Sequence, residues 1–227
     1  MAPASDGVMG AWQTLAFPSP WQVYQNMHVI MQQFIYNKPM KLGKNFFNQP
    51  AIELAKALLG THLVFGKLRG MIVETEAYLY RDDPASHAAP GLTKRNAPMF
   101  GPAGYSYVYL IYGMYHCFNI VSGKTGEGEA VLIRALQPID GIDLMQKRRN
   151  TTKIENLCSG PGKLTQAFGI TKEHNNLDLS ESKEIQIHSN PAANFKIQNS
   201  KRIGLSVGQD LELRFFIENN SFVSKSR

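Results

Sequence analysis

Two carboxylates and an aromatic ring are spaced for hydrolytic chemistry in the segment MIVETEAYLY. Glu74, Glu76 and Tyr78 occupy every second position, and side chains at i, i+2 and i+4 of a β-strand share one face. Two such acids lie about 7 Å apart at the backbone, a separation compatible with an acid and a base that flank a glycosidic bond. The same spacing also fits a solvated strand face, or a structural ion pair with Lys67 or Arg69, and such structural pairs outnumber catalytic ones.

A run of tyrosines follows in the segment YSYVYLIYGMY. Tyr105, Tyr107 and Tyr109 share one face of the expected strand, and packing within the sheet would explain Tyr105 and Tyr107 equally well. Tyr112 stands beside Gly113, where the chain must turn, and a bulky ring at a hairpin tip gains little from the core. An exposed ring on a rigid tip of a basic protein is suited to insertion between stacked bases.

The charge of the chain favours a polyanionic partner such as nucleic acid. The 227 residues carry a formal net charge of +6, and 43% of them are hydrophobic, which is enough to bury a substantial core. Residues 1–40 contain one acidic and one basic residue, Asp6 and Lys38, so the excess charge lies in the remainder. Cys117 and Cys158 cannot form a disulfide framework and match no zinc spacing, which predicts a reducing compartment and no structural metal.

Residues 1–40 differ from the rest of the chain in being rich in Met, Gln and Pro. Apolar residues at helical spacing predict a short amphipathic helix there: Val23, Met27, Ile30, Met31 and Phe34. No basic leader precedes an uninterrupted apolar core, and the segment is too polar to span a membrane, so we expect a protein that is neither secreted nor membrane-bound. We expect residues 1–40 to be an appendage, partly disordered, residues 41–219 to form a single domain, and residues 220–227 to be a frayed tail.

The elements that would position the candidate side chains are mostly strands. The segment NQPAIELAKALLG predicts a helix with Pro50 at its first helical position and Gly60 as its stop. Asp140 is expected to cap a helix that runs into MQKRRN, and another helix is expected over SGPGKLTQAFG. Strands are expected at 61–66 and 71–80, joined by the hairpin-length KLRG, on both sides of a turn at 112–115, and at 129–138, 183–189, 195–199 and 210–218. Neighbouring strands with interspersed helices favour an α+β single domain around an antiparallel sheet over a βαβ arrangement.

Four segments, in this order, together resemble the alkyladenine (3-methyladenine) DNA glycosylase family of base-excision repair: RGMIVETEAY, RNAPMFGPAGYSYVYLIYGMYHCFNI, VLIRALQP and LCSGPGKL. The resemblance covers roughly residues 41–219. It implies a monofunctional enzyme that flips a damaged purine, of the 3-methyladenine, 7-methylguanine or hypoxanthine type, out of double-stranded DNA. It also implies hydrolysis of the N-glycosidic bond to leave an abasic site, a monomer without metal or organic cofactor, and a mostly antiparallel curved β-sheet with flanking helices and a protruding β-hairpin.

The resemblance also assigns roles by position. It implies that Glu76 is the base that activates water, whereas Glu74 is not credited with catalysis. Arg134 and His87 would complete the catalytic set by holding that water or the adjacent phosphate. The flipped base would contact Tyr78, His87, Tyr109 and Asn119, the last of which would crowd the 2-amino group of guanine. DNA contacts would come from Tyr112, as the intercalating wedge, and from Met114, Tyr115, Arg95 and Lys163.

Other functions fit the sequence less well. SGPGKLT has some similarity to a phosphate loop, but Leu164 follows Lys163 where Ser or Thr is required, which rejects nucleotide hydrolysis. A noncatalytic nucleic-acid-binding module of the same fold would require changes at the base or the water-holding residues, and these are present. A glycoside hydrolase that acts on free sugars would show no affinity for duplex DNA.

For a DNA glycosylase, the expected compartment is the cytoplasm in a bacterium and the nucleus in a eukaryote.

Overall fold

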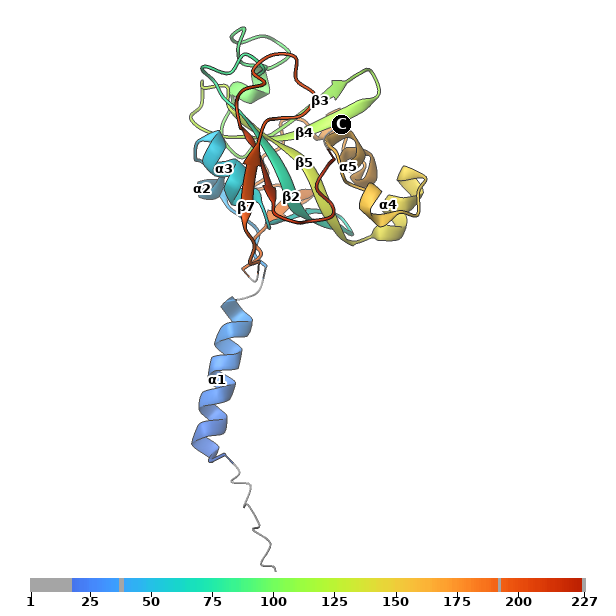
Figure 1. The fold of residues 1–227 in the computed structure, drawn as a ribbon. Helices are drawn as coiled ribbons and strands as arrows, with labels where there is room; N and C mark the ends of the chain where they lie inside the picture. The colour runs from blue at the N-terminus through green and yellow to red at the C-terminus, as the bar shows by residue number, and fades with distance from the viewer. Residues whose placement is uncertain (1–17, 37–38, 192, 226–227) are drawn as a thin grey trace, which may run out of the picture. The chain divides into compact units, whose positions relative to one another are not determined.

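The structure is a computed structural model that describes residues 18–36, 39–191 and 193–225 (Figure 1). It divides the chain into two compact units, residues 1–38 and residues 39–227. Within the described ranges, no helix combines the length and the hydrophobicity that crossing a bilayer requires.

The described part of the first unit is one helix, α1 (Pro20–Tyr36), at the place where apolar spacing predicted a helix. It contains no Asp, Glu, Lys or Arg, and the side chains of Val23 and Met27 are exposed. The other three apolar positions that suggested an amphipathic helix have side chains outside the described residues: Ile30, Met31 and Phe34. The helix is therefore confirmed, whereas its amphipathic character stays a prediction.

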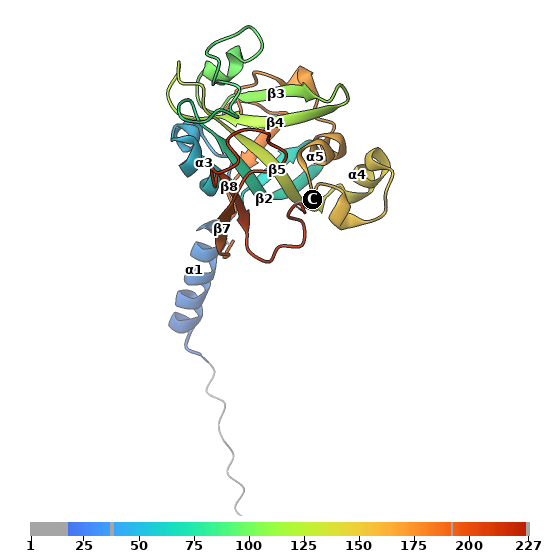
Figure 2. The same ribbon diagram turned by 45° about the horizontal axis from the view of Figure 1, so that its top comes forward.

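The second unit is built on a curled antiparallel sheet. Its strands are β1 (His62–Phe65), β2 (Leu68–Tyr78), β3 (Ser106–Ile111), β4 (Tyr115–Val121), β5 (Ala130–Asp140), β6 (Ile185–His188), β7 (Ile197–Ser200) and β8 (Arg214–Ile217). The main path is β3-β4-β5-β2-β1-β6, while β8 pairs with β2 and β7 pairs with β8. Figure 2 shows β3, β4, β5 and β2 following one another across the sheet. This arrangement, with helices interspersed, confirms the expected α+β fold.

The curl of the sheet has a local origin in β2. β5 pairs along one edge of β2, whereas the opposite edge is shared by β1, opposite Leu68–Met71, and β8, opposite Glu74–Glu76. The ladder with β5 shifts register on both sides of Glu74, close to where the partner on the other edge changes. Such bulges bend a strand and increase its twist, which lets one strand serve two differently directed parts of the sheet.

Four α-helices flank the sheet: α2 (Lys44–Phe47), α3 (Ala51–Leu58), α4 (Ile142–Arg149) and α5 (Pro161–Phe168). Single 3-10 turns lie at Ala97–Phe100, Ile154–Asn156 and Lys172–His174. Buried residues of α3 recur at helical spacing and form its core face: Ala51, Leu54, Ala55 and Leu58. The Thr75 hydroxyl of β2 donates to the carbonyl of Ala55 at 2.9 Å, so Thr75 faces α3. The alternation of β2 therefore directs Glu74 and Glu76 to the opposite side.

Three local expectations are corrected by the structure. Asp140 does not cap a helix, because it ends β5 and binds Arg69 at 2.8 Å, while α4 starts after Gly141, whose φ of 75° makes the sharp turn. The β1–β2 connection is shorter than KLRG, because β2 already begins at Leu68. The single turn α2 was not foreseen, since four residues are too few to show a period.

The C-terminal segment is also corrected. Phe222 and Val223 pack against the core, and Ser224 is buried. The tail is therefore not frayed over its described part, because the backbone and hydroxyl of Ser224 hydrogen bond to the buried Glu74.

Candidate active site

The two acids of β2 are both fully buried. The guanidinium of Arg134, on β5, contacts both of them: its Nε is 3.0 Å from Glu74 Oε1 and its Nη1 is 3.3 Å from Glu76 Oε1. The alternative of a solvated strand face is therefore wrong, and so is an ion pair with Arg69, which binds Asp140 instead. Burying two carboxylates carries a desolvation penalty that a surface strand would avoid, and this favours a functional role for the pair.

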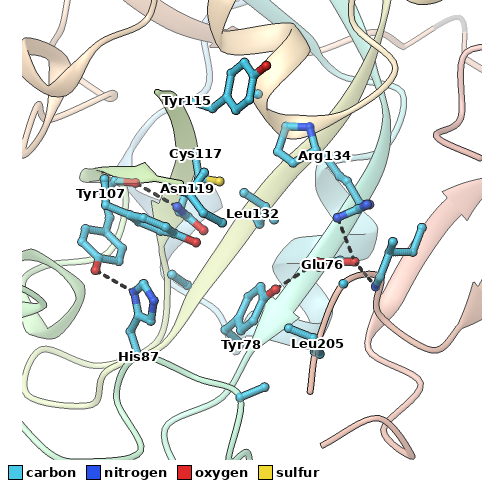
Figure 3. A pocket seen from close by; sticks show the side chains of 18 of the residues that line it. Glu76, Tyr78, His87, Tyr107, Tyr115, Cys117, Asn119, Leu132, Arg134 and Leu205 are labelled. Carbon is cyan, nitrogen blue, oxygen red and sulfur yellow. Dashed lines mark hydrogen bonds and ion pairs between the residues drawn. The ribbon is translucent and has the colours of Figure 1, made fainter. Parts of the chain in front are cut away.

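A cavity of about 360 Å³ opens beside Glu76 (Figure 3). This volume lies in the range of small-molecule pockets. Nine of the residues to which the resemblance assigns roles line it: Glu76, Tyr78, His87, Arg95, Tyr109, Tyr112, Tyr115, Asn119 and Arg134. Met114 and Lys163 are not among the lining residues. The wall also includes residues that sequence reasoning did not identify, notably Met99, Leu132, Ile203, Gly204 and Leu205.

Glu76 is held at the cavity wall by three donors. Its Oε1 accepts from the backbone N–H of Ile203 at 2.9 Å and lies 3.3 Å from Arg134, while its Oε2 accepts from the Tyr78 hydroxyl at 3.0 Å (Figure 3). Burial raises the pKa of Glu76 above its usual value, and these three donors oppose that rise. The site thus contains a fixed carboxylate whose basicity exceeds that of a surface glutamate, as a general base requires.

Aromatic rings form much of the remaining wall. The rings of His87 and Tyr109 lie 4.6 Å apart between centroids, and His87 Nδ1 is 2.9 Å from the Tyr107 hydroxyl. Burial lowers the pKa of His87, with a further contribution from Arg95, so the imidazole is neutral near pH 7. Burial also raises the pKa of Tyr78 well above its usual value, which keeps its hydroxyl protonated as a donor to Glu76. These rings offer flat faces that suit a planar heterocycle.

A buried ion pair fixes one side of this wall. Arg202 Nη2 lies 2.6 Å from Asp83 Oδ1, its Nη1 lies 2.7 Å from Asp83 Oδ2, and both side chains are fully buried. The guanidinium stacks 4.6 Å from the centre of the Tyr78 ring and donates to the carbonyl of Ala77. The neighbouring residue, Ile203, supplies the backbone donor to Glu76. Sequence reasoning missed this pair, since its members are 119 positions apart and no local pattern joins them.

Besides Tyr115, two further residues of β4 line the same cavity, Asn119 and Cys117. Asn119 is buried, and its Nδ2 donates to the carbonyl of Tyr107 at 3.0 Å, which fixes the orientation of the amide. Cys117 is a free, buried thiol that lines the cavity as well. Burial raises the pKa of the Cys117 thiol to about 11, so the sulfur is uncharged near pH 7.

The β3–β4 hairpin carries an exposed aromatic tip beside the cavity. Tyr112 is 78% exposed, and its φ of 52° places a non-glycine residue in the left-handed region, an unfavourable conformation that is held only where the surroundings fix it. Met114 is also exposed. Tyr115 packs closely against Gly162 of α5. If Gly162 were replaced by a residue with a Cβ, that atom would lie only 3.0 Å from the Tyr115 Cβ. The predicted turn is confirmed, and its ring is presented to solvent rather than to the core.

The basic candidates occupy different positions. Arg95 is exposed at the cavity rim, whereas Lys163 lies in the first turn of α5 with its Nζ 3.3 Å from the Ser159 hydroxyl. Arg148, in the last turn of α4, donates to the carbonyls of Ala167 and Phe168 at the end of α5. That arginine therefore caps a helix. Among the described residues, no group of three or more His, Cys, Asp or Glu side chains is placed to bind a metal ion.

Comparisons with known proteins identify the family to which the chain is similar. Residues 45–221 match the family model described as methylpurine-DNA glycosylase. A protein of Methanoculleus marisnigri named "Putative 3-methyladenine DNA glycosylase" is 47% identical over 194 residues, which cover 82% of this chain and 100% of the relative. Proteins of the same name are 49% identical over 182 residues in Francisella tularensis, covering 77% and 93%, and 47% identical over 185 residues in Agrobacterium fabrum, covering 82% and 93%.

Proposed function

The chain belongs to the methylpurine-DNA glycosylase family and is therefore a DNA glycosylase of base-excision repair, and from this premise we propose which bond it cuts and how. The substrate is a damaged purine of the 3-methyladenine, 7-methylguanine or hypoxanthine type in duplex DNA. The enzyme extrudes the nucleotide, and water activated by Glu76 attacks C1′ of the deoxyribose. The product is an abasic site, with no strand cleavage.

One observation supports this proposal above the others. Glu76 is a buried carboxylate, fixed by three donors, in the wall of an aromatic cavity whose rim carries an exposed tyrosine. A base inside duplex DNA hides its sugar carbon, so an enzyme that attacks that carbon must first extrude the nucleotide. The cavity supplies a place for the extruded base, and Tyr112 supplies a ring for the gap left in the stack.

The energies of base extrusion and stacking are comparable. Unstacking one nucleotide costs a few kcal/mol, less for a damaged or mispaired base. Stacking on aromatic side chains is worth about 1–3 kcal/mol per base, and Tyr78, His87 and Tyr109 offer such faces. Cationic alkylpurines gain further attraction from electron-rich rings. The cavity would therefore favour bases whose pairing is already weak.

The cleavage step needs little beyond a positioned base. Water loses a proton to Glu76 as its oxygen bonds to C1′, and the electrons of the broken C1′–N bond move to the purine. This neutralises an alkylated cation, whereas a neutral base such as hypoxanthine leaves as an anion and takes a proton from solvent. Arg134 and His87 would hold the water or the adjacent phosphate, the first as a permanent cation and the second as a neutral imidazole. Asn119, fixed by its bond to Tyr107, would crowd the 2-amino group of normal guanine.

The test is base release from defined duplexes. Oligonucleotide duplexes that contain one hypoxanthine or one 3-methyladenine are incubated with the protein, and free base and alkali-labile abasic sites are quantified. Equal amounts of both products are expected, with no strand break before alkali and no release from an undamaged duplex. Failure to release either base would contradict the proposal and leave a noncatalytic DNA-binding module of this fold.

Replacing Tyr112 with Ala should weaken binding to a lesion-containing duplex about tenfold or more, because the wedge no longer fills the gap in the stack. The melting temperature should change little, since the ring is 78% exposed. Ile197→Ala, at an exposed apolar residue of β7, is the matched control. Unchanged lesion affinity of the Tyr112 variant, measured by fluorescence anisotropy, would remove the wedge role.

The pH dependence follows from the direction of two pKa shifts. Glu76 must be ionised to accept a proton, so the rate should fall about tenfold for each pH unit below its pKa. Because burial raises this pKa above 4.5, the usual value for a glutamate, the fall, which forms the acidic limb of the pH profile, should begin at a higher pH than it would for an exposed glutamate. The pKa of His87 is lowered, so this group should not add a step near pH 6.5. Single-turnover release of hypoxanthine between pH 4.5 and 8 measures the limb, and a flat profile would contradict it.

A further inference from the structure

We propose that Arg214 and Ser224, close to the C-terminus, are positioning residues of this site. Through Glu74 they hold Arg134 in the orientation in which it contacts Glu76. The inference rests on the proposed role of Glu76 as the base, and it gives a function to Glu74, the acid to which the family resemblance assigns none.

Glu74 is surrounded by donors from three separate parts of the chain. Its Oε1 lies 2.6 Å from Arg214 Nε on β8, 3.0 Å from Arg134 Nε on β5 and 2.8 Å from the Ser224 hydroxyl. Its Oε2 accepts from the backbone N–H of Ser224 at 2.7 Å. A carboxylate without access to water is thus fully occupied by protein donors, which fixes its position.

The geometry of Arg134 transmits this position to Glu76. A guanidinium is planar, and its donors point in fixed directions. Once Nε is held by Glu74 Oε1 at 3.0 Å and by the Ser224 hydroxyl at 3.2 Å, the direction of Nη1 is set, and Nη1 lies 3.3 Å from Glu76. A displacement at Glu74 would therefore move the cation that faces the base.

Arg214 and Ser224 also support each other. Arg214 Nη2 donates to the carbonyl of Ser224 at 3.2 Å, and its Nη1 donates to the Ser200 hydroxyl at 2.9 Å. The segment after β8 is thereby tied to the buried side of the site, where Ser224 is 7% exposed. These contacts explain why a segment of polar sequence is ordered at the very end of the described chain.

Arg214 shares with Arg134 the task of neutralising the charge of Glu74. Two carboxylates face two guanidinium groups, so Arg134 does not have to neutralise Glu74 alone. Without Arg214 or the Ser224 hydroxyl, Glu74 would draw Arg134 toward itself and away from Glu76. Arg134 lowers the pKa of Glu76 against the effect of burial, so its withdrawal would raise that pKa further. Tyr78 and the backbone N–H of Ile203 also donate to Glu76 and lower its pKa, and the charge of Glu76 in turn affects the pKa values of the nearby Tyr109, Cys117 and Arg202.

The test compares pH profiles of single-turnover hypoxanthine release for Ser224→Ala and Arg214→Lys. Both variants should move the acidic limb upward by about one pH unit, so that release is about tenfold slower than wild type below the limb and equal to it above. Ser224→Thr, which keeps the hydroxyl and the N–H, should restore the wild-type profile. Ser221→Ala, at an exposed serine three positions earlier, is the matched control.

The outcomes distinguish the positioning role of Arg214 and Ser224 from the proposed function of the enzyme. Suppose that the wild type releases base, that Glu76→Gln does not, and that the pH profiles of Ser224→Ala and Arg214→Lys are unshifted. This result would overturn the positioning role and leave the proposed function intact. A loss that is uniform with pH would also overturn it, because a merely structural defect lowers the amount of active enzyme at every pH. If Ser224→Ala does not fold, the Arg214→Lys profile decides. Absence of release by the wild type would overturn the proposed function itself.

Discussion

Replacing Glu76 with Gln is expected to slow hypoxanthine release by about a thousandfold, within the range that a positioned general base contributes. Gln has the same shape but accepts no proton at neutral pH, so the variant removes the chemistry and keeps the volume of the cavity wall. Single-turnover rates on a duplex with one hypoxanthine measure the effect. Equal rates for wild type and variant would show that another group, or none, activates the water.

Binding and folding controls separate this effect from structural damage. The variant should still bind the lesion duplex, because the aromatic wall and the tip at Tyr112 are untouched. Glu155→Gln, at an exposed glutamate on a surface turn, controls for the loss of one negative charge and should be fully active. A Glu76 variant that loses DNA affinity and rate together would indicate a collapsed cavity rather than a missing base.

Local sequence patterns were sufficient for the elements that carry the site. The period-2 alternation around Thr75 correctly predicted that Glu76 and its neighbour Tyr78 would share a side of β2, because the side-chain direction in a strand depends only on parity. The helix over Ala51–Leu58 followed from its apolar spacing in the same way, although Pro50 is its N-cap and not its first helical residue. The exposed ring at Tyr112 followed from the position of Gly113 at the turn.

The contacts that fix the site could not be predicted in this way. Ser224 reaches Glu74 across 150 positions, and Arg202 reaches Asp83 across 119. Ser224, Asp83 and Arg202 are polar residues in segments without periodicity, where the sequence gives no sign of burial. Burial of such groups depends on pairing with a specific distant partner. Residues that carry the proposed chemistry were therefore easier to identify than the residues that hold them.

The pair Asp83–Arg202 is expected to dominate the stability of the cavity wall. Arg202→Met removes a bidentate partner and leaves the Asp83 carboxylate buried with only the backbone N–H groups of Leu79 and Ala85 as donors. Breaking a buried ion pair in this manner destabilises a protein by about 3–5 kcal/mol. Arg69→Met breaks a pair of similar length, 2.8 Å to Asp140, at partly exposed side chains, and should cost at most about 1 kcal/mol. Urea denaturation of both variants measures the difference.

The same variant also distinguishes a stabilising pair from one that shapes the site. Arg202 stacks on the ring of Tyr78, and the next residue, Ile203, donates its N–H to Glu76. The short segment 202–203 therefore contacts both Tyr78 and the catalytic carboxylate. If the pair only stabilises the fold, a temperature well below the transition should restore the wild-type release rate. If it shapes the site, release should stay slow when the variant is fully folded, because Glu76 has lost a fixed donor. Equal free energies of unfolding for Arg202→Met and Arg69→Met would show that the buried pair Asp83–Arg202 stabilises the fold no more than the exposed pair Arg69–Asp140.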